Sequence, residues 1–385
     1  MTQKITSFLL SVALMASCSN KQTSSETILV NDAIQMRVNL SDYVVSLEYI
    51  PLETQQECLI DRNPSFYVFD EYIVTTTSQQ CFLFDRSGKF IREIGRVGSG
   101  PDEYRSAGWG VINEKIQTVL FPGWNKRIEY SINGKATRYF PFIPNTSTAT
   151  AYVSDSILVL GVGNPSGDAI NQLVFINQEN VVDSIPNYQF FNPLDPNTFG
   201  GFGNEFSFYR YRDDLYYKNL FNDTIFRIKD NKLHPIWVFD MGQYHLPRSI
   251  MANMNTFMTE RMKYNSLQNI LETDPFLLFT IARERSDSTF IFDKRKGQVF
   301  IMQKEQNLKG FYNDIDGGMP FLPAFINGKQ ELVSFLYPYE IKEILTNEYF
   351  VRKNILDEAA NLRLKEMIIR LQEDDNPVVV IARLK

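Results

Sequence analysis

The sequence predicts an all-β fold, a six-bladed β-propeller with a helical insertion and a C-terminal helix. Short runs rich in Val, Ile, Phe and Tyr alternate with Gly, Asn, Asp or Pro along the chain, which is typical of strands joined by tight turns. Six pairs of these runs form hairpins, with turns at Gly88, Gly134, Asn180, Asn231, Gly297 and Gly328. Successive turns are 46, 46, 51, 66 and 31 residues apart. A period of roughly 40–50 residues indicates propeller blades of four strands, whereas a β-sandwich lacks this longer period.

A helical insertion over residues 247–272 accounts for the gap of 66 residues between two of the turns. Apolar residues there recur mostly at steps of three and four, which predicts a helix: Met251, Met254, Met258, Met262 and Leu267. We expect this stripe to pack on the ring. The alternative is a groove for a partner, because Met-rich surfaces adapt to different ligands.

A second helix is predicted over residues 355–373, before a terminal strand over residues 378–384. Its apolar stripe consists of Leu356, Ala360, Leu364, Met367 and Leu371. The polar run EDDNP at residues 373–377 ends the helix. A propeller must close its ring without an open strand edge. The last strand is therefore expected to complete a blade, within one propeller domain over residues 31–385.

The N-terminus predicts export and a lipid anchor. An apolar run from Ile5 to Ala16 follows Lys4 and is shorter than the roughly 20 residues that cross a bilayer. The run ends in LMASC, so small residues precede Cys18, as in a bacterial lipobox. We therefore expect a signal peptide over residues 1–17, lipidation of Cys18 and a tether over residues 18–30. The alternative is an ordinary signal peptide that is cleaved after a small residue.

The composition describes a folded and acidic protein of 385 residues. It is 44% hydrophobic and 22% charged, with a formal net charge of −6. This charge argues against non-specific binding to nucleic acid, which needs a basic face. With Cys18 lipidated, Cys58 and Cys81 remain; they either pair in an oxidising compartment or stay as free buried thiols.

The segment from Leu83 to Ile112 (LFDRSGKFIREIGRVGSGPDEYRSAGWGVI) resembles the repeat of NHL-type propellers. The whole mature chain resembles the six-bladed β-propeller lipoproteins of Gram-negative bacteria. The features that match lie at residues 48–54 (EYIPLET), 95–104 (GRVGSGPDEY), 222–225 (NDTI), 313–318 (NDIDGG) and 376–385. Asp102 departs from the family, which more often has Gly there. The resemblance implies a six-bladed propeller on a lipid anchor in the outer membrane, periplasmic or surface-facing, and implies little about chemistry.

The candidate ligand site lies where a link between blades enters an inner strand. The link GRVGSGPDEY brings Arg96, Glu103 and Tyr104 to such an entry, and Trp109 begins the next inner strand. A cation, an acceptor, a phenol and an indole together suit a polar ligand with a ring, such as a sugar. The alternative is structural: Arg96 pairs with Glu103, and Tyr104 packs between blades.

Other motifs carry weaker predictions. The glycines of GRVGSG precede a proline and a strand, so they do not form the phosphate-binding start of a helix. The NDIDGG motif resembles the start of a calcium loop, but position twelve counted from Asp314 is Phe325, so an EF-hand is excluded and Asx turns are expected. Only His234 and His245 are available for histidine chemistry, and no cofactor or metal is predicted.

Three functions remain open. The expected one is a lipid-anchored binding or scaffold module for a ligand, a glycan, a peptide or a protein of the cell envelope. The alternative is a propeller enzyme, a lyase or hydrolase, with its site in the central channel. The third is a structural component of an envelope complex that docks through the helical insertion. Convergence of acids and bases with shifted pKa values in the channel would favour the enzyme.

Overall fold

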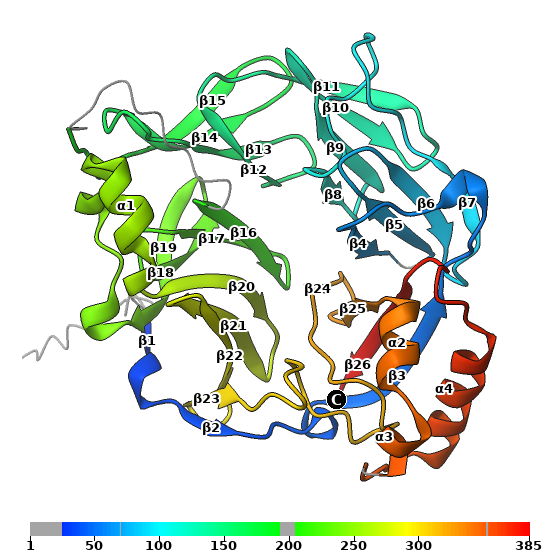
Figure 1. Ribbon diagram of the computed structural model, residues 1–385. Helices are drawn as coiled ribbons and strands as arrows, with labels where there is room; N and C mark the ends of the chain where they lie inside the picture. The colour runs from blue at the N-terminus through cyan, green and yellow to red at the C-terminus, as the bar shows by residue number, and fades with distance from the viewer. Residues whose placement is uncertain (1–24, 70, 193–204, 352) are drawn as a thin grey trace, which may run out of the picture.

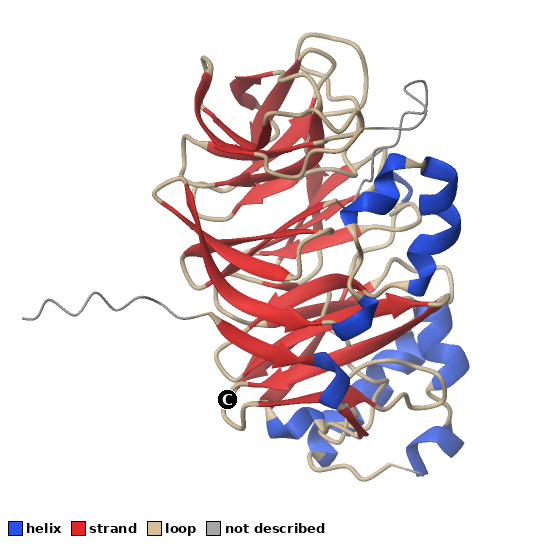
Figure 2. Ribbon diagram, turned by 90° about the vertical axis from the view of Figure 1, so that its left-hand side faces the viewer, coloured by secondary structure: helices blue, strands red, loops and turns tan. Residues whose placement is uncertain are grey.

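The computed structural model describes residues 25–69, 71–192, 205–351 and 353–385, which form a ring of six β-sheets (Figure 1). The sheets follow one another around the ring as the blades of a propeller, so the fold class predicted from the turns is confirmed. Helices and long connections gather on one side of the ring (Figure 2). Among the described residues, no helix combines the length and apolar character that a membrane span requires.

Blades 1 to 3 each contain four antiparallel strands in chain order from the axis outward. Blade 1 consists of β4 (Ser65–Val68), β5 (Tyr72–Thr76), β6 (Cys81–Asp85) and β7 (Phe90–Glu93). Blade 2 consists of β8 (Val111–Asn113), β9 (Thr118–Pro122), β10 (Lys126–Ser131) and β11 (Ala136–Pro141). Blade 3 consists of β12 (Thr146–Tyr152), β13 (Leu158–Val162), β14 (Asn171–Ile176) and β15 (Val181–Pro186).

The N-terminal segment adds a fifth, parallel strand to each of the next two blades. Blade 4 consists of β16 (Phe206–Tyr211), β17 (Asp214–Asn219), β18 (Thr224–Lys229), β19 (Lys232–Asp240) and the added β1 (Glu26–Leu29). Blade 5 consists of β20 (Ser266–Glu272), β21 (Phe276–Arg283), β22 (Ser286–Asp293), β23 (Gln298–Met302) and the added β2 (Ile34–Met36).

Blade 6 closes the ring with strands from both ends of the chain. It consists of β24 (Phe325–Ile326), β25 (Leu332–Leu336), β26 (Val378–Leu384) and β3 (Val44–Pro51). The terminal strand β26 lies between β25 and β3 and is antiparallel to both. Each pairing extends over most of β26, so the two ends of the chain hold each other in place.

The closure explains why the last predicted turn follows the one before it by only 31 residues. Five of the six predicted turns join the third and fourth strands of blades 1 to 5, whereas Gly328 joins the first two strands of blade 6. Because the other two strands of blade 6 come from residues 44–51 and 378–384, that blade has no second hairpin of its own. Gly88 illustrates why a glycine is needed: its φ is +88°, and a Cβ there would lie 2.3 Å from the Pro51 carbonyl oxygen.

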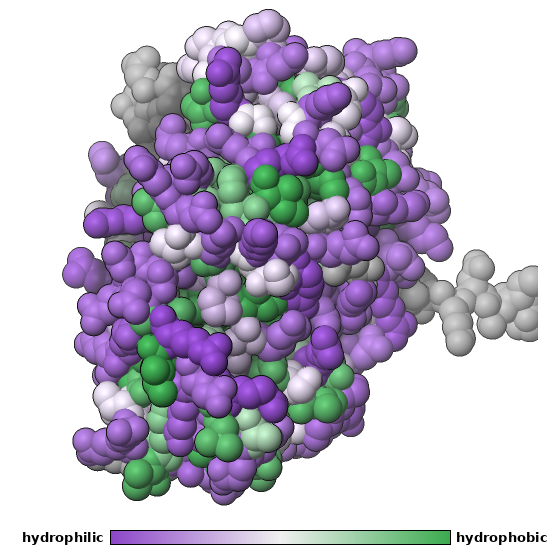
Figure 3. Space-filling view, turned by 90° about the vertical axis from the view of Figure 1, so that its right-hand side faces the viewer, coloured by the Kyte–Doolittle hydropathy of each residue, from purple (hydrophilic) through white to green (hydrophobic). Residues whose placement is uncertain are grey.

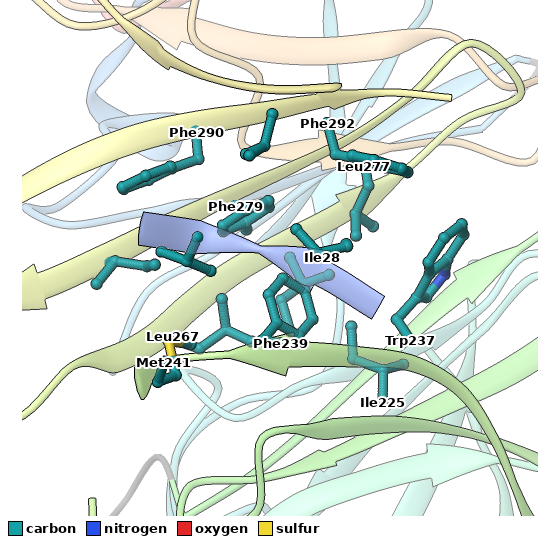
Figure 4. Close-up of a cluster of buried hydrophobic side chains, with 14 of the residues drawn as sticks. Ile28, Ile225, Trp237, Phe239, Met241, Leu267, Leu277, Phe279, Phe290 and Phe292 are labelled. Carbon is teal, nitrogen blue, oxygen red and sulfur yellow. The ribbon is translucent and has the colours of Figure 1, made fainter. Parts of the chain in front are cut away.

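Strand alternation divides the apolar side chains between neighbouring blades. Phe290 and Phe292 on β22 join the cluster between blades 4 and 5, while Ile291 joins the cluster between blades 5 and 6. The cluster between blades 4 and 5 includes stacked rings of Phe279 and Phe290, whose centroids are 5.3 Å apart (Figure 4). Both faces of the sheet are thus buried, which is why the strands are apolar over most of their length.

The predicted tether over residues 18–30 extends too far into the chain. β1 (Glu26–Leu29) is part of blade 4, and Ile28 is 1% exposed within the cluster of Figure 4. The fold therefore includes residues from Glu26 on. The predicted signal peptide (1–17) and the lipidated Cys18 lie outside the described residues.

The predicted insertion over residues 247–272 is helical only in its first part. It contains two 3₁₀ turns, at Arg248–Ala252 and Arg261–Lys263, and α1 (Met254–Glu260), and Met251 is buried. Residues 266–272 form β20, the inner strand of blade 5, so the helical prediction is wrong there. A bulge explains the error: Asn269 has a φ of +50°, and the register shifts between Gln268 and Leu271. Leu267 and Ile270 thereby face one cluster with helical spacing.

Three helices lie between β25 and β26: α2 (Pro338–Ile344), α3 (Asn347–Val351) and α4 (Glu358–Arg370). The sequence predicted one helix, over 355–373, which corresponds to α4. Asp357 caps α4 by accepting a hydrogen bond from the Ala360 N–H, so the helix begins after Leu356. Leu356 is exposed, whereas Leu364 and Leu371 pack in a cluster with α2 and α3.

Candidate functional site

The two faces of the ring differ in what their loops present. One face of the ring carries the links between blades and the loops between the second and third strands of each blade, because of the direction of the strands. We call it the link face. The opposite turn face carries the hairpin turns. The seven exposed aromatic residues among those described all lie in link-face loops, in the helices there, or near the link-face end of β11: Trp109, Trp124, Tyr139, Phe142, Tyr188, Phe190 and Tyr339. Figure 3 shows that the rim near β7, β3 and α4 is mainly hydrophilic, with separate apolar patches.

A cavity of about 470 Å³ opens on the link face between blades 2 and 3. This volume is within the usual range for a small-ligand site, roughly 300–1,000 Å³. Blade 2 and its loops contribute Arg105, Trp109, Val111, Leu120, Phe121, Pro122, Gly123, Lys126 and Arg127. The other wall contains Phe142, Asn145, Thr146, Thr150, Gly163, Pro165 and Glu205. We call this the first cavity.

A second cavity of about 600 Å³ adjoins the first one over blade 2 and shares Gly123 and Lys126 with it. Its other lining residues are Ser99, Gly100, Pro101, Glu103, Trp124, Asn125 and Ile128. We call the two together the blade 2 groove.

Backbone hydrogen bonds fix the loops that form the groove. The Arg105 N–H donates to the Pro122 carbonyl at 2.8 Å, which ties the link to the β9–β10 loop. That loop closes tightly, with the Gly123 N–H on the Lys126 carbonyl at 2.8 Å. The Trp124 indole N–H donates to the Gly98 carbonyl at 2.9 Å, although 62% of Trp124 is exposed. The indole is thus held by one edge and its surface stays open to solvent.

Three cations line the first cavity: Arg105, Lys126 and Arg127. The guanidinium carbon of Arg105 lies 5.7 Å from the ring centroids of both Trp109 and Trp124. The Lys126 ammonium lies 3.7 Å from the centroid of the Tyr139 ring. These contacts orient the cations without neutralising their charge.

Arg127 is buried and has neutral partners. Its guanidinium donates to the Pro141 carbonyl and to the Thr146 hydroxyl, each at 2.9 Å. Burial lowers the pKa of Arg127 to about 10. The wall of the cavity therefore contains a desolvated positive charge, and the two oxygens that accept its hydrogen bonds carry no formal charge.

The carboxylates nearest the groove already have partners. Glu205 forms an ion pair with Arg248 at 2.9 Å, and both side chains are largely buried. Glu103 forms an ion pair with Arg96 at 2.6 Å and accepts a hydrogen bond from the Gly100 N–H. These two interactions hold the pKa of Glu103 below its usual range.

The structure separates the four residues that the sequence grouped into a ligand site. Trp109 lines the first cavity and is 43% exposed, and Glu103 lines the second. Arg96 points its charge at Glu103. Tyr104 is fully buried between blades 1 and 2, where its hydroxyl donates to the Ile94 carbonyl at 3.1 Å. This geometry matches the structural alternative for Arg96, Glu103 and Tyr104, while a ligand role for Trp109 stays a prediction.

Sequence reasoning did not identify Arg105, Trp124, Lys126 or Phe142. The signal was present in PGWNKR at residues 122–127, where an indole in a short loop is followed by two cations at the start of β10. A tryptophan in such a loop has no core to pack in and is therefore a candidate for ligand contact.

The two remaining cysteines are free thiols. Cys58 packs in the cluster between blades 6 and 1, and Cys81 in the one between blades 1 and 2. Burial raises the pKa of the Cys81 thiol above its usual range. The structure thus contains Cys58 and Cys81 as free buried thiols and not as a disulfide.

The NDIDGG segment forms Asx turns and binds neighbouring elements. Asn313 accepts hydrogen bonds from the N–H groups of Ile315 and Asp316, and Asp314 accepts two from Ser41. In the part of the chain that the structure describes, no three His, Cys, Asp or Glu side chains gather as metal ligands. His245 lies against the Asp223 carboxylate and so joins the NDTI turn to the helical insertion.

Among the described residues, the carboxyl groups with a raised pKa do not gather in the channel. Burial raises the pKa of two described carboxyl groups, Glu93 on the outer strand of blade 1 and Asp316 in the link after β23, which are on separate blades. At the turn-face end of the channel, Glu114 accepts a hydrogen bond from the Gly328 N–H at 2.8 Å, and Arg210 donates to the carbonyl of Tyr152. These groups join blades to one another.

The fold and the groove together define a six-bladed β-propeller with a candidate ligand site on its link face. The chain belongs to the family described as Domain of unknown function (DUF4934), whose model matches residues 25–383. It has no significant match among curated proteins.

A solved structure shares the fold. The chain is similar to a "Putative exported protein" from Bacteroides fragilis, with a TM-score of 0.69 and 15% identity over 93% of this chain and 99% of that one. The similarity to the β-propeller domain of the Trilobed protease from Pyrococcus furiosus is weaker, with a TM-score of 0.34 and 13% identity over 63% of this chain and 71% of that one. At these identities the likeness concerns the fold alone.

Proposed function

We propose that the protein is an exported, lipid-anchored binding module that holds a ligand in the blade 2 groove. The observation that carries the proposal is the combination of a cavity of about 470 Å³ with exposed aromatic surfaces around it, on the face that carries the links. Exposed aromatic side chains lose apolar contact with water when a ligand covers them, and their rigid rings lose little entropy on binding. A glycan, a peptide or another envelope component would gain from the same surfaces.

The Trp109 side chain provides the test. We would screen neutral and acidic glycans and short peptides against the full chain in detergent by intrinsic-fluorescence thermal shift. Trp109→Ala should weaken a hit by roughly tenfold or more, as expected for loss of an aromatic contact. Val182→Ala removes an exposed apolar side chain near the turn-face end of β15 and serves as the matched control. A hit that retains its affinity in folded Trp109→Ala would place the binding surface elsewhere.

The lipid anchor is tested separately. The residues around Cys18 support the anchor, and the similar "Putative exported protein" of Bacteroides fragilis supports export. Cys18→Ala should move the protein from the membrane fraction to the soluble fraction, because the acyl chains that would hold it on the bilayer are attached to Cys18. Fractionation identical to that of the unaltered chain would contradict the anchor and leave the binding proposal intact.

A further inference from the structure

The charge of the blade 2 groove specifies a ligand class. The protein as a whole has a net charge of −6, yet Arg105, Lys126 and Arg127 line one cavity. No ion pair among the described residues neutralises any of them, while Glu205 and Glu103 are each paired with an arginine. Because Glu103 and Glu205 are already paired, and Asp102 beside the second cavity accepts a hydrogen bond from the Tyr139 hydroxyl, the three cations give the groove positive charge to offer a ligand.

Arg127 shows why an anion would be favoured in this position. Burial removes water from its guanidinium, and the two oxygens it binds are those of a carbonyl and a hydroxyl. A buried charge without a counter-charge is costly, and a negative group in the adjoining cavity would offset that cost. Arg105 and Lys126, which are more accessible, can contact such a group directly.

The shape of the groove indicates a ligand with more than one ring. Its two cavities meet at Lys126, and Arg105 lies between the indoles of Trp109 and Trp124, one from each cavity. A chain of sugar rings could place one ring on each indole and a negative group near each cation. Asn145 and Thr150 along the far wall offer hydrogen-bond partners for sugar hydroxyls.

A sugar fits these features better than an acidic peptide does. The flat C–H face of a pyranose packs on an exposed indole, whereas an extended peptide has no rigid flat face except at an aromatic side chain. A peptide would also need partners for each backbone N–H and C=O that it buries. The groove lining consists mainly of side chains with cationic, aromatic and aliphatic groups.

We propose that the blade 2 groove binds an acidic oligosaccharide, with carboxylate or sulfate groups on Arg105 and Lys126 and sugar rings on Trp109 and Trp124. This inference rests on the proposed function, since it names the ligand class of the same groove.

The test uses isothermal titration calorimetry with the full chain in detergent. The probes are an oligogalacturonate trimer, its methyl ester, a chondroitin sulfate tetrasaccharide and a hexaglutamate peptide. We expect an acidic glycan to bind and the uncharged ester to bind at least about tenfold more weakly, because charge-assisted hydrogen bonds are lost. The trimer carries carboxylates alone and the chondroitin sulfate carries both carboxylates and sulfates, so binding of the trimer shows that carboxylates suffice, and binding of the tetrasaccharide alone points to sulfate. Added salt should weaken binding of the acidic glycan.

Two substitutions locate the charge effect. Arg105→Gln and Lys126→Gln should each lower the affinity for the acidic glycan by about tenfold and leave binding of the ester unchanged. Lys89→Gln removes one exposed positive charge on the turn face and is the matched control. Thermal unfolding of each variant shows whether it is folded, and the comparison of trimer with ester in the unaltered protein needs no variant.

The outcomes separate this inference from the proposed function. Equal binding of trimer and ester that is lost in Trp109→Ala would overturn the charge inference and support the groove as a binding site. Binding of the peptide alone would overturn the sugar class and keep the site. If the acidic glycan bound with unchanged affinity to Trp109→Ala, Arg105→Gln and Lys126→Gln, both the charge inference and the proposed function would be overturned. Absence of binding by every probe and every screened compound would also overturn both.

Discussion

The side chain of Asn376 accepts a hydrogen bond from the Ile60 N–H at 2.9 Å, across 316 positions of sequence. Its amide nitrogen donates to the carbonyls of Glu53 and Cys58 at 2.7 and 2.8 Å, and its own N–H donates to the Thr54 hydroxyl. One asparagine thus joins the segment before β26 to the segment after β3. Both of these strands belong to blade 6, so the contacts reinforce the closure of the ring at the edge of the sheet.

Asn376→Ala should lower the free energy of unfolding by about 3 kcal/mol, because it removes the partner of the partly buried Ile60 N–H and of the Cys58 carbonyl and leaves the Glu53 carbonyl with only the Cys58 thiol. Only 4% of Asn376 is exposed, so water cannot replace these bonds without opening the fold. Urea unfolding followed by tryptophan fluorescence measures the loss. Asn133→Ala, at an exposed turn residue, is the control and should change stability by less than about 0.5 kcal/mol. Equal effects of the two substitutions would show that Asn376 does not fasten the ring.

Lys218 makes the stability of the protein depend on pH in the alkaline range. It is 2% exposed on β17, and burial lowers its pKa from 10.5 to about 8. The unfolded chain therefore binds more protons than the folded one between about pH 8 and 10.5, and stability gains from this group as the pH rises through that window. Below about pH 8, the folded state contains the charged and buried Lys218 ammonium, which lowers the free energy of unfolding.

Lys218→Met should raise the free energy of unfolding at pH 7 by about 1–2 kcal/mol, which is less than the full pKa shift implies. The reduction arises because the substitution also removes the hydrogen bond from Lys218 to the Asn219 carbonyl. The advantage of the variant should shrink when urea unfolding is repeated at pH 10.5. An advantage of the same size at both pH values would show that the ammonium is not desolvated in the fold.

Tyr104→Phe separates packing from ligand contact in the link between blades 1 and 2. The ring of Tyr104 packs against Phe121 and Tyr130, so Phe keeps the core and loses only the hydrogen bond to Ile94. We expect a loss of about 1 kcal/mol in the free energy of unfolding and no change in affinity for a ligand of the groove. Trp109→Ala should show the reverse pattern. If Tyr104→Phe lowered the affinity for the ligand and left the free energy of unfolding unchanged, Tyr104 would be part of the binding site.

The repeat was readable in the sequence because each blade needs the same local chemistry at its outer turn. Gly88, Gly134 and Gly297 have positive φ, which glycine adopts most easily, and each lies in the turn between the third and fourth strands of its blade. The terminal strand 378–384 was also readable, since five consecutive buried residues give a continuous apolar run. These features depend on neighbours along the chain.

The groove could not be derived in the same way, because its walls come from separate segments. Arg105 is in one link, Lys126 at the start of β10, and Pro165 in a loop of the following blade. Nothing in their spacing indicates that they share a cavity, since only the angle between blades brings them together. The helical prediction for residues 266–272 was wrong for a different reason. The bulge at Asn269 gives this strand the apolar spacing of a helix.

A chain that ends at Asp375 should fail to fold. It lacks β26, whose residues Val378 to Ala382 are at most 2% exposed and pair with β25 on one side and β3 on the other. At about 1.5–3 kcal/mol for each larger aliphatic side chain, the loss is comparable to the whole stability of a typical protein, about 5–15 kcal/mol. The truncation also leaves β25 and β3 with open edges, which favour aggregation. We expect insoluble protein, or soluble protein without a cooperative thermal transition.

A chain that ends at Leu384 is the control and should melt like the full chain, because it loses only Lys385 and the hydrogen bond from its N–H to the Tyr43 carbonyl. If the chain that ends at Asp375 also melts like the full chain, β26 is not what closes the ring.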